Sequence, residues 1–462
     1  MYDLADTHPT PQFARPAWQD LTGEWQFAFD PDDRGRDSHW ERETKPFDRA
    51  ITVPFPPESE ASGIGDPDPH RVVWYRREVD ISSLDRRDEQ RPRLHFGAVD
   101  YRADVWVNGN HVAFHEGGHT PFQVDITPAL AIDSTTAVIV VRAEDDPEDL
   151  GQPRGKQDWQ TPSHGIWYRR TTGIWQPVWL DVVGQHHLAD VHWQPDAHTL
   201  SLGATFTISP PARSPLTLRV ELSLNGETLA DDRISVTGET TTSRWQVGEP
   251  GHPGSRNTVL WSPGNPNLIE ATLTLLDGDT VLDTVQSYAG LRSVGADHQS
   301  FLLNAFPCYL RSVLEQGFWP ESHLAAPSPE AIRREVELIL VLGFNHARIH
   351  QKVEDPRFLA WCDRLGLMVW GEMANAFTWS DRAVSRVTKE WTDVVLRDRN
   401  HPSIVGWVPI NESWGVPALP SEPAQRHWQE SLWHLTHALD GSRPVDQQRW
   451  LGTHHQRHPH HP

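Results

Sequence analysis

The last third of the chain repeats one pattern, a short apolar run followed by a helix-like period, and this repetition limits the possible folds more than any other feature. Four repeats can be counted after about residue 293. The second run spans residues 345–350, the third ends at Glu372, and the fourth, residues 403–408, leads to Asn411 and Glu412. Because such short runs suit buried strands and the periods between them suit helices, the pattern predicts parallel strands in a sheet or barrel.

The two ends of this region carry weaker signals. We expect the first strand near residues 308–310, with Ser328 as the N-cap of its helix and Pro329 in the first turn. Gly441 ends the fourth helix, and residues 443–445 begin a fifth strand. We therefore assign residues 293–445 to one α/β domain.

The rest of the chain reads as two all-β modules. Residues 1–183 contain short apolar strands and the hairpin signal Asn108-Gly109, which predicts an antiparallel sandwich. Residues 184–292 contain alternating strands around Asn225-Gly226 and Asp277-Gly278, which suits an immunoglobulin-like sandwich. A length of 462 residues accommodates these domains with substantial cores.

Composition excludes several functions. A net charge of −22 repels phosphate backbones and anionic lipids, so we expect neither a nucleic acid nor a membrane surface as partner. The N-terminus lacks a secretory pattern, no apolar run approaches the ~18 residues of a membrane span, and the chain has only 2 cysteines. These features predict a cytoplasmic protein without a structural disulfide. No Cys/His pattern has zinc spacing, so we expect no metal and no cofactor.

The strongest motif is the segment around the fourth strand, DRNHPSIVGWVPINESWG (residues 398–415). It resembles the acid/base signature of glycoside hydrolase family 2, which includes β-galactosidases, β-glucuronidases and β-mannosidases. Gly406 and Val408 depart mildly from that signature. Three N-terminal segments are similar, in order and in residue identity, to the jelly roll that opens family 2 enzymes. They are TGEWQFAFD, VDYRADVWVNGNHVAFHEGGHTPFQVDIT and TTGIWQPVWLDVV.

The resemblance implies a fold and a reaction. The fold would be a jelly-roll sandwich, an immunoglobulin-like sandwich and the first half of a (β/α)₈ TIM barrel. The reaction would be hydrolysis of a β-linked glycoside with retention, which needs two carboxyl groups about 5 Å apart. Glu412 would be the general acid/base, and Asn411 would hydrogen-bond the 2-hydroxyl of the sugar. A raised carboxyl pKa, produced by a neighbouring carboxylate, is the usual requirement for such an acid.

Further site residues follow from a second signature in residues 343–373. Arg348 matches the family at the end of the second strand, but His350 stands in a segment where the usual His-Tyr-Pro is absent, which affects sugar specificity more than fold. We name Arg348, His350 and Glu372 as substrate-binding candidates; a purely structural salt bridge is an equal alternative for Arg348. The loop residues Trp414 and Trp319 are candidates for stacking on sugar rings, and packing is the alternative for both. The 22 Trp suit a sugar-stacking protein, although most of them belong to cores.

The resemblance does not extend to the whole catalytic machinery. Family 2 enzymes take their nucleophilic Glu from the end of strand seven, and this chain reaches only strand five, so we assign no nucleophile and expect a C-terminally truncated chain that is inactive alone. Two alternatives stay open. One is a non-catalytic carbohydrate-binding protein, in which the jelly roll either binds sugar or is a scaffold. The other is one half of a split enzyme. A homo-oligomer is compatible with either.

The tail, residues 446–462, departs from the family abruptly. It is rich in His and Gln and has no apolar period. We interpret it as a frameshift product, with an authentic but unstructured tail as the alternative. Sequencing the DNA would decide between them, because the shifted frame should remain open and encode a strand-seven Glu.

Overall fold

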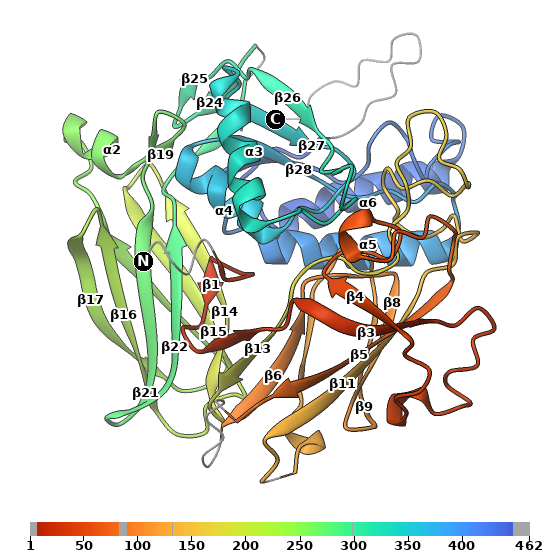
Figure 1. The fold of residues 1–462 in the computed structure, drawn as a ribbon. Coiled ribbons are helices and arrows are strands. Elements are labelled where there is room, and N and C mark those ends of the chain that lie inside the picture. Colours follow the sequence, from red (N-terminus) through yellow and green to blue (C-terminus); the bar gives the residue numbers. More distant parts are fainter. Residues whose placement is uncertain (1–6, 83–89, 132, 298, 447–462) are drawn as a thin grey trace.

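The computed structural model describes residues 7–82, 90–131, 133–297 and 299–446. Figure 1 shows two antiparallel sandwiches and an α/β unit, with the helices α5 and α6 between the parallel strands and the first sandwich. Of the tail predicted at residues 446–462, all but residue 446 lies outside the described residues. The structure therefore does not test whether the tail is a frameshift product.

The first sandwich packs two antiparallel sheets around one apolar core. The six-stranded sheet contains, in spatial order, β4 (Arg49–Val53), β3 (Gly23–Phe29), β5 (Val72–Asp80), β11 (Thr136–Glu144), β8 (Arg102–Val107) and β9 (Asn110–Glu116). The four-stranded sheet contains β10 (Phe122–Asp125), β6 (Arg91–Phe96), β13 (Val178–Val183) and β2 (Trp18–Asp20). Short elements complete it: β7 (Val99–Asp100) paired with β12 (Gly173–Ile174), and the 3-10 helices η1 (Trp40–Arg42), η2 (Glu60–Ser62) and η3 (Thr127–Ala129).

The hairpin expected between β8 and β9 is confirmed. Asn108 and Gly109 have φ values of 50° and 74°, which is the left-handed pair that a type I′ turn requires. This turn matches the twist of the strands that it joins, so the two-residue sequence signal was sufficient to place it.

The second sandwich also packs two antiparallel sheets around a core of its own. The five-stranded sheet contains β1 (Phe13–Ala14), β22 (Thr280–Ala289), β21 (Ile269–Asp277), β16 (Leu216–Leu224) and β17 (Glu227–Val236), and the three-stranded sheet contains β14 (His187–Asp196), β15 (Ser201–Ser209) and β18 (Thr240–Gln246). The helix α2 (Pro253–Val259) and the pair β19 (Trp261–Ser262) and β20 (Asn265–Pro266) follow. The pairing of β1 with β22 joins the N-terminal segment to this sandwich, which a division at residue 183 does not anticipate.

The α/β unit contains four parallel strands in chain order, each followed by a helix. The elements are β26 (Ser312–Glu315), α3 (Pro329–Val341), β27 (His346–Ile349), α4 (Pro356–Leu365), β28 (Met368–Glu372), α5 (Asp381–Asp398), β29 (Ile404–Val408) and α6 (Pro423–Leu439). A small antiparallel sheet precedes them: β23 (Val294–Ala296), β24 (Phe301–Leu303) and β25 (Phe306–Pro307). Val445 pairs with Trp407 in parallel, beside β29. The described residues form no closed barrel.

The local signals explain most of these helices. Ser328 accepts a hydrogen bond from the Ala331 N–H at 3.2 Å, and Pro329 occupies the first turn, as the sequence predicts for α3. Ser380 caps α5 in the same way, with the Ala383 N–H at 3.1 Å.

The prediction for the first parallel strand was wrong. Residues 308–310 lie before the strand, and Tyr309 is 82% exposed. Ser312–Glu315 pairs with β27 instead. Its sequence, SVLE, has one apolar side chain on each face. Val313 packs against the helix-covered core, whereas Leu314 on the opposite face is 50% exposed. The segment therefore lacks the continuous apolar run that marks a strand buried on both faces.

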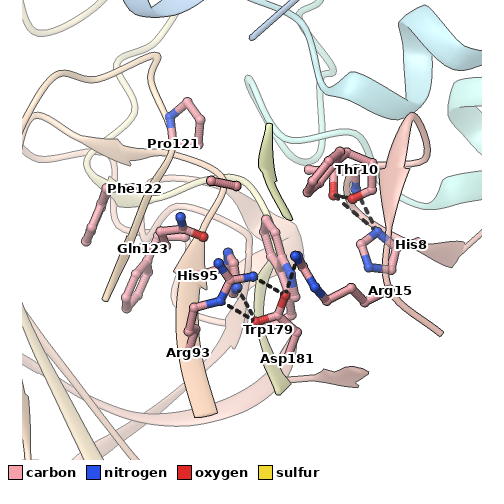
Figure 2. Close-up of a pocket in the computed structure, with 13 residues that line it drawn as sticks. His8, Thr10, Arg15, Arg93, His95, Pro121, Phe122, Gln123, Trp179 and Asp181 are labelled. Atoms are coloured by element: carbon pink, nitrogen blue, oxygen red, sulfur yellow. Dashed lines mark hydrogen bonds and ion pairs between the residues drawn. The ribbon is translucent and has the colours of Figure 1, made fainter. Parts of the chain in front are cut away.

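A buried ionic cluster ties the two sandwiches together (Figure 2). Asp181 on β13 accepts hydrogen bonds from Arg15, Arg93 and His95 at 3.2, 2.7 and 2.8 Å. Arg15 also pairs with Asp283 of the second sandwich at 2.8 Å. Although burial opposes ionisation, His95 and Arg93 hold the pKa of Asp181 well below its usual range. The side chains line a cavity of about 270 Å³ in which both guanidinium groups are already paired with carboxylates.

The helix α5 docks on the first sandwich through polar contacts. Arg386 donates hydrogen bonds to Glu116 at 3.0 Å and to Asp149 at 2.8 Å. One turn later, Glu390 is 1% exposed, and its Oε2 lies 3.3 Å from the His119 N–H. Burial raises the pKa of Glu390 to about 8, and the nearby Asp100 raises it further, although the His119 N–H acts in the opposite direction.

Stability should therefore fall as the pH rises toward 8. Glu390 has an ordinary pKa of 4.5 and a folded value of about 8, so between these values the folded state holds a proton that the unfolded state has lost. The free energy of unfolding then decreases with pH, by about 1.4 kcal/mol per pH unit for one proton. We expect Glu390→Gln to reduce this slope, measured as urea unfolding at pH 5.5, 7 and 8.5. Glu337→Gln, at a partly exposed position on the outer side of α3, should keep the wild-type slope; equal slopes in the two variants would contradict the assignment.

The α/β unit should be the part of the chain most sensitive to proteolysis. The strand β26 lies at an open edge of the parallel sheet. At the end of the neighbouring helix α3, Val341 and the C-cap residue Leu342 are 78% and 73% exposed. The sandwiches each have a complete core. We expect limited trypsin digestion to leave the two sandwiches intact and to clip residues 293–440 first. Equal resistance of that segment, followed by mass spectrometry over time, would contradict this.

Candidate active site

The carboxyl ends of the four parallel strands meet at one edge of the sheet, and most of the sequence-predicted site residues lie there. Glu315 ends β26, His350 follows β27, Glu372 ends β28, and residues 409–412 follow β29. In parallel α/β folds this edge is where ligands bind, because the loops that follow the strands converge on it.

Three of the predicted residues form a hydrogen-bonded chain across this edge. Arg348 donates from Nε to Glu372 Oε2 at 2.7 Å and from Nη2 to Asn411 Oδ1 at 2.5 Å. The other oxygen of Glu372 accepts the Gln351 N–H at 3.0 Å and lies 3.0 Å from His350 Nδ1. The side chain of Glu372 is completely buried, whereas that of Arg348 is 29% exposed. The buried carboxylate of Glu372 therefore fixes the position of the partly exposed Arg348.

Asn411 is fixed on two sides and has one free donor. Its backbone N–H donates to Asn375 Oδ1 at 2.8 Å, and its own Oδ1 accepts from Arg348. Its Nδ2 is buried and has no hydrogen-bond partner within the described chain. An unsatisfied buried amide donor costs about 1–3 kcal/mol, so the geometry of Asn411 suits a ligand oxygen.

Glu412 lies in a strained turn next to the hydrogen-bonded residues Arg348 and Asn411. Glu412 and Ser413 have φ values of 48° and 63°, in the left-handed region that side chains rarely adopt. The turn is closed by the Trp414 N–H, which donates to Asn411 O at 2.9 Å. The residue Glu412 is exposed, so its carboxyl group is accessible to a ligand at the same edge as Asn411.

A long loop from the first sandwich, residues 145–172, reaches this edge. Gly155 donates its N–H to Asn375 O at 3.1 Å, and Leu150 O accepts the Phe377 N–H at 2.9 Å. Gly155 has φ +62°, and a Cβ atom there would lie 1.9 Å from Gln351 O, so only glycine permits this approach. The loop thereby becomes one wall of the candidate site.

The loop carries Lys156 and two tryptophans into the site. Lys156 Nζ lies 4.7 Å from the centre of the Trp167 ring. Burial lowers the pKa of Lys156, while the charge of Glu412 acts in the opposite direction, which places the two side chains within electrostatic reach. Trp167 contacts Trp414 edge to face at 5.0 Å between ring centres.

The two predicted aromatic residues differ in their surroundings. Trp414 belongs to a cluster with Trp159, Trp167 and Phe377, at ring-centre distances of 4.6–5.6 Å. Trp319 lies in the loop after β26, where its backbone pairs with that of His323. No contact among the described residues joins Trp319 to Arg348 or Asn411.

Sequence reasoning missed several residues of this edge. Asn375 lies three residues after Glu372, so its position near a strand end was a usable signal. Lys156, Trp159 and Trp167 lie in a loop of another domain, and no local pattern indicates their location. Asp446 was also missed: although the residue is exposed, partial burial of its carboxyl group raises its pKa, with Arg348 and Glu372 near enough to influence it.

Three further features concern metal ligands, cysteines and membrane-spanning helices. Across the described ranges, no group of three or more His, Cys, Asp or Glu side chains is arranged to hold a metal ion. Cys308 and Cys362 are free thiols. None of the helices in the described part of the chain combines the length and apolarity that a membrane crossing requires.

Comparison with known proteins connects this geometry to one family. Models of glycosyl hydrolases family 2 match the chain in three places: the sugar binding domain over residues 18–148, the central family 2 domain over residues 186–292, and the TIM barrel domain over residues 297–456. The chain belongs to glycoside hydrolase family 2. Its architecture is accordingly a sugar-binding-type sandwich, an immunoglobulin-like sandwich and a TIM-barrel-type domain.

Individual relatives agree with this placement. The chain is 27% identical to a β-galactosidase of Thermoanaerobacter pseudethanolicus, over 82% of this chain and 49% of the relative. It is 26% identical to a β-glucuronidase of Felis catus, over 92% of this chain and 68% of the relative. The chain spans about half the length of the first curated relatives that it matches.

Solved structures share the fold. A β-glucuronidase of Bifidobacterium dentium, solved with coumarin-3-O-glucuronide, has a TM-score of 0.78 at 20% identity and covers 94% of this chain and 74% of that one. A β-glycosidase from Bacteroides vulgatus has a TM-score of 0.73 at 23% identity and covers 93% and 53%.

Proposed function

We propose that the edge formed by Arg348, Glu372, Asn411 and Glu412 is the acid/base half of the active site of a retaining β-glycosidase. The observation that carries the proposal is the hydrogen bonding of Asn411. Its Oδ1 and backbone N–H are fixed by Arg348 and Asn375, and its buried Nδ2 is left for a ligand oxygen. The neighbouring Glu412 is exposed and so can exchange a proton with a bound glycoside.

Each side chain has a defined part in this proposal. Glu412 protonates the glycosidic oxygen as the bond breaks, and later removes a proton from the attacking water. The amide of Asn411 donates to the 2-hydroxyl of the sugar, a contact that strengthens in the transition state. Arg348 orients Asn411, and Glu372, which has no accessible side-chain surface, orients Arg348.

The aromatic wall suits the apolar face of a sugar. Trp167 contacts both Trp414, two residues after Glu412, and Lys156, whose pKa the charge of Glu412 influences. Because relatives include a β-galactosidase and a β-glucuronidase, β-galactosides and β-glucuronides are the substrates to test first.

We further propose that the four parallel strands are the first half of a (β/α)₈ barrel, with domain boundaries near residues 183 and 292. A retaining glycosidase needs a nucleophilic carboxylate about 5–5.5 Å from the acid. The family places that Glu at the end of strand seven, and the buried Glu372 is already engaged by Arg348 and the Gln351 N–H. A polypeptide of these 462 residues alone should therefore not turn over substrate.

The test compares two proteins. One is the 462-residue polypeptide. The other continues the barrel beyond residue 445, as encoded by the DNA in whichever frame remains open. Both are assayed with aryl β-galactosides and aryl β-glucuronides. We expect turnover only in the second. If the second protein binds sugars but hydrolyses none, the carbohydrate-binding alternative replaces the proposal. If the barrel strands are encoded by a separate chain, mixing the two chains should restore turnover.

A further inference from the structure

A second cavity lies between the second sandwich and the amino-terminal end of the parallel sheet, opposite to Glu412. It has a volume of about 310 Å³. Residues from β14, the end of β22, the segment before β29 and the segment after α6 line it. The polar lining residues that matter here are His192, Arg292, Arg399, Asp440, Ser442 and Arg443.

The charge balance of this cavity differs from that of the cavity in Figure 2. There, Arg15 and Arg93 both pair with carboxylates. Of the described residues that line the present cavity, three carry guanidinium groups and only Asp440 carries a carboxylate. Asp440 is already occupied, since it pairs with Arg443 and accepts the Trp407 Nε1–H at 2.8 Å.

Arg292 is buried without a counterion among the residues that the structure describes. It is 4% exposed, and it donates from Nε to Pro402 O at 2.8 Å and from Nη2 to Ile404 O at 2.7 Å. No ion pair joins its guanidinium group to a carboxylate within the described chain, where its hydrogen bonds go to these two backbone carbonyls. Burial and the neighbouring Arg443 lower the pKa of Arg292 well below its usual range, although the charges of Asp440 and Asp363 act in the opposite direction. A buried cation in this situation is strongly stabilised by an anion.

Arg399 and His192 add donors to the same cavity. The Nε of Arg399 is buried and has no partner in the described chain, and its Nη2 makes only a 3.4 Å contact with Asp190, whose side chain is 52% exposed. Burial and the charge of Arg399 lower the pKa of His192 to about 4, so its imidazole is neutral near pH 7 and offers one N–H.

We propose that this cavity binds a small oxyanion, a phosphate or a carboxylate group, between Arg292 and Arg399. Guanidinium groups match both kinds of oxyanion through paired N–H donors. The cavity is large enough to hold an anion that carries a further small substituent. Because its lining residues come from the second sandwich and from both flanks of β29, the bound anion would join these two domains. This site does not depend on the proposed glycosidase activity.

Equilibrium dialysis of the 462-residue chain with inorganic phosphate, and separately with malonate, tests the proposal. Ionic strength is held constant with sodium chloride, so that general screening does not change. We expect saturable binding of one equivalent of at least one of the two anions, together with a rise in Tm. The anion that binds more tightly identifies the preferred oxyanion. No saturable binding of either anion would overturn the proposal.

Two variants of equal charge change make the test specific. Arg399→Gln removes a donor at the partly exposed mouth of the cavity and should weaken binding about tenfold or more, since hydrogen bonds to charged groups contribute about 1.5–3 kcal/mol. Arg219→Gln removes the same charge from the outer face of the second sandwich, where Arg219 pairs with Asp231, and should leave binding unchanged. Equal weakening in both variants would show a general charge effect and would contradict the site. Circular dichroism and Tm without anion confirm that both variants fold.

Discussion

Replacement of Glu412 by Gln is expected to lower kcat by about 10²–10⁴-fold in a protein that contains the complete barrel. The glutamine keeps the size of the side chain but can neither donate the proton to the leaving oxygen nor activate the water. The loss should be largest for glycosides with poor leaving groups, because these need protonation most. Initial rates with a series of aryl β-glycosides of rising leaving-group pKa measure this dependence.

A matched control lies in the same loop. Glu422 precedes α6, is exposed, and makes no side-chain capping bond, so Glu422→Gln should keep the wild-type kcat. A Glu412→Gln enzyme with more than a tenth of the wild-type kcat on poor leaving groups would exclude Glu412 as the acid/base. In the 462-residue polypeptide, both variants and the parent should be equally inactive.

Asp363→Ala should be among the most destabilising single substitutions in the chain. Asp363 on α4 is fully buried and accepts hydrogen bonds from His401 Nδ1 at 2.5 Å, the Ser403 N–H at 2.9 Å and the Tyr288 hydroxyl at 2.8 Å. Tyr288 belongs to the second sandwich, so the carboxylate joins two domains. Removing one partner of a buried ionic network costs about 3–5 kcal/mol. Urea unfolding at pH 7 measures the loss.

The pH dependence separates this network from simple packing. Although burial opposes it, the contacts with His401 and Ser403 lower the pKa of Asp363 below its ordinary value of 3.8. The stabilisation is therefore present above about pH 4 and is lost as the pH falls through the folded pKa. The difference between wild type and Asp363→Ala should shrink in acid. Asp393→Ala, at a partly exposed position where only an i,i+4 contact with Lys389 is lost, should cost less than about 1 kcal/mol. A loss under 1 kcal/mol for Asp363→Ala would show that the network is dispensable.

Most strands and helices of the α/β unit could be predicted from local sequence. The strands β27, β28 and β29 and the helices α3 to α6 follow apolar periods and capping residues such as Ser328, which caps α3, and these signals act over a few residues. The same signals place Arg348, Glu372 and Asn411 at strand ends. β26 was missed because SVLE has only one apolar side chain per face, which gives no continuous apolar run.

The sequence by itself therefore determined the types and order of the elements, the two hairpin-rich modules, and the candidate acid Glu412 with its flanking motif. Only the tertiary structure decided which distant segments meet. It brought Lys156 within the influence of Glu412 and Trp167 into contact with Trp414. It also paired β1 with β22 and left Arg292 without a counterion among the described residues. The physical reason is that hydrogen-bonding periods and caps are local, whereas loop docking and charge pairing depend on side chains hundreds of residues apart, which leave no periodic trace in the chain.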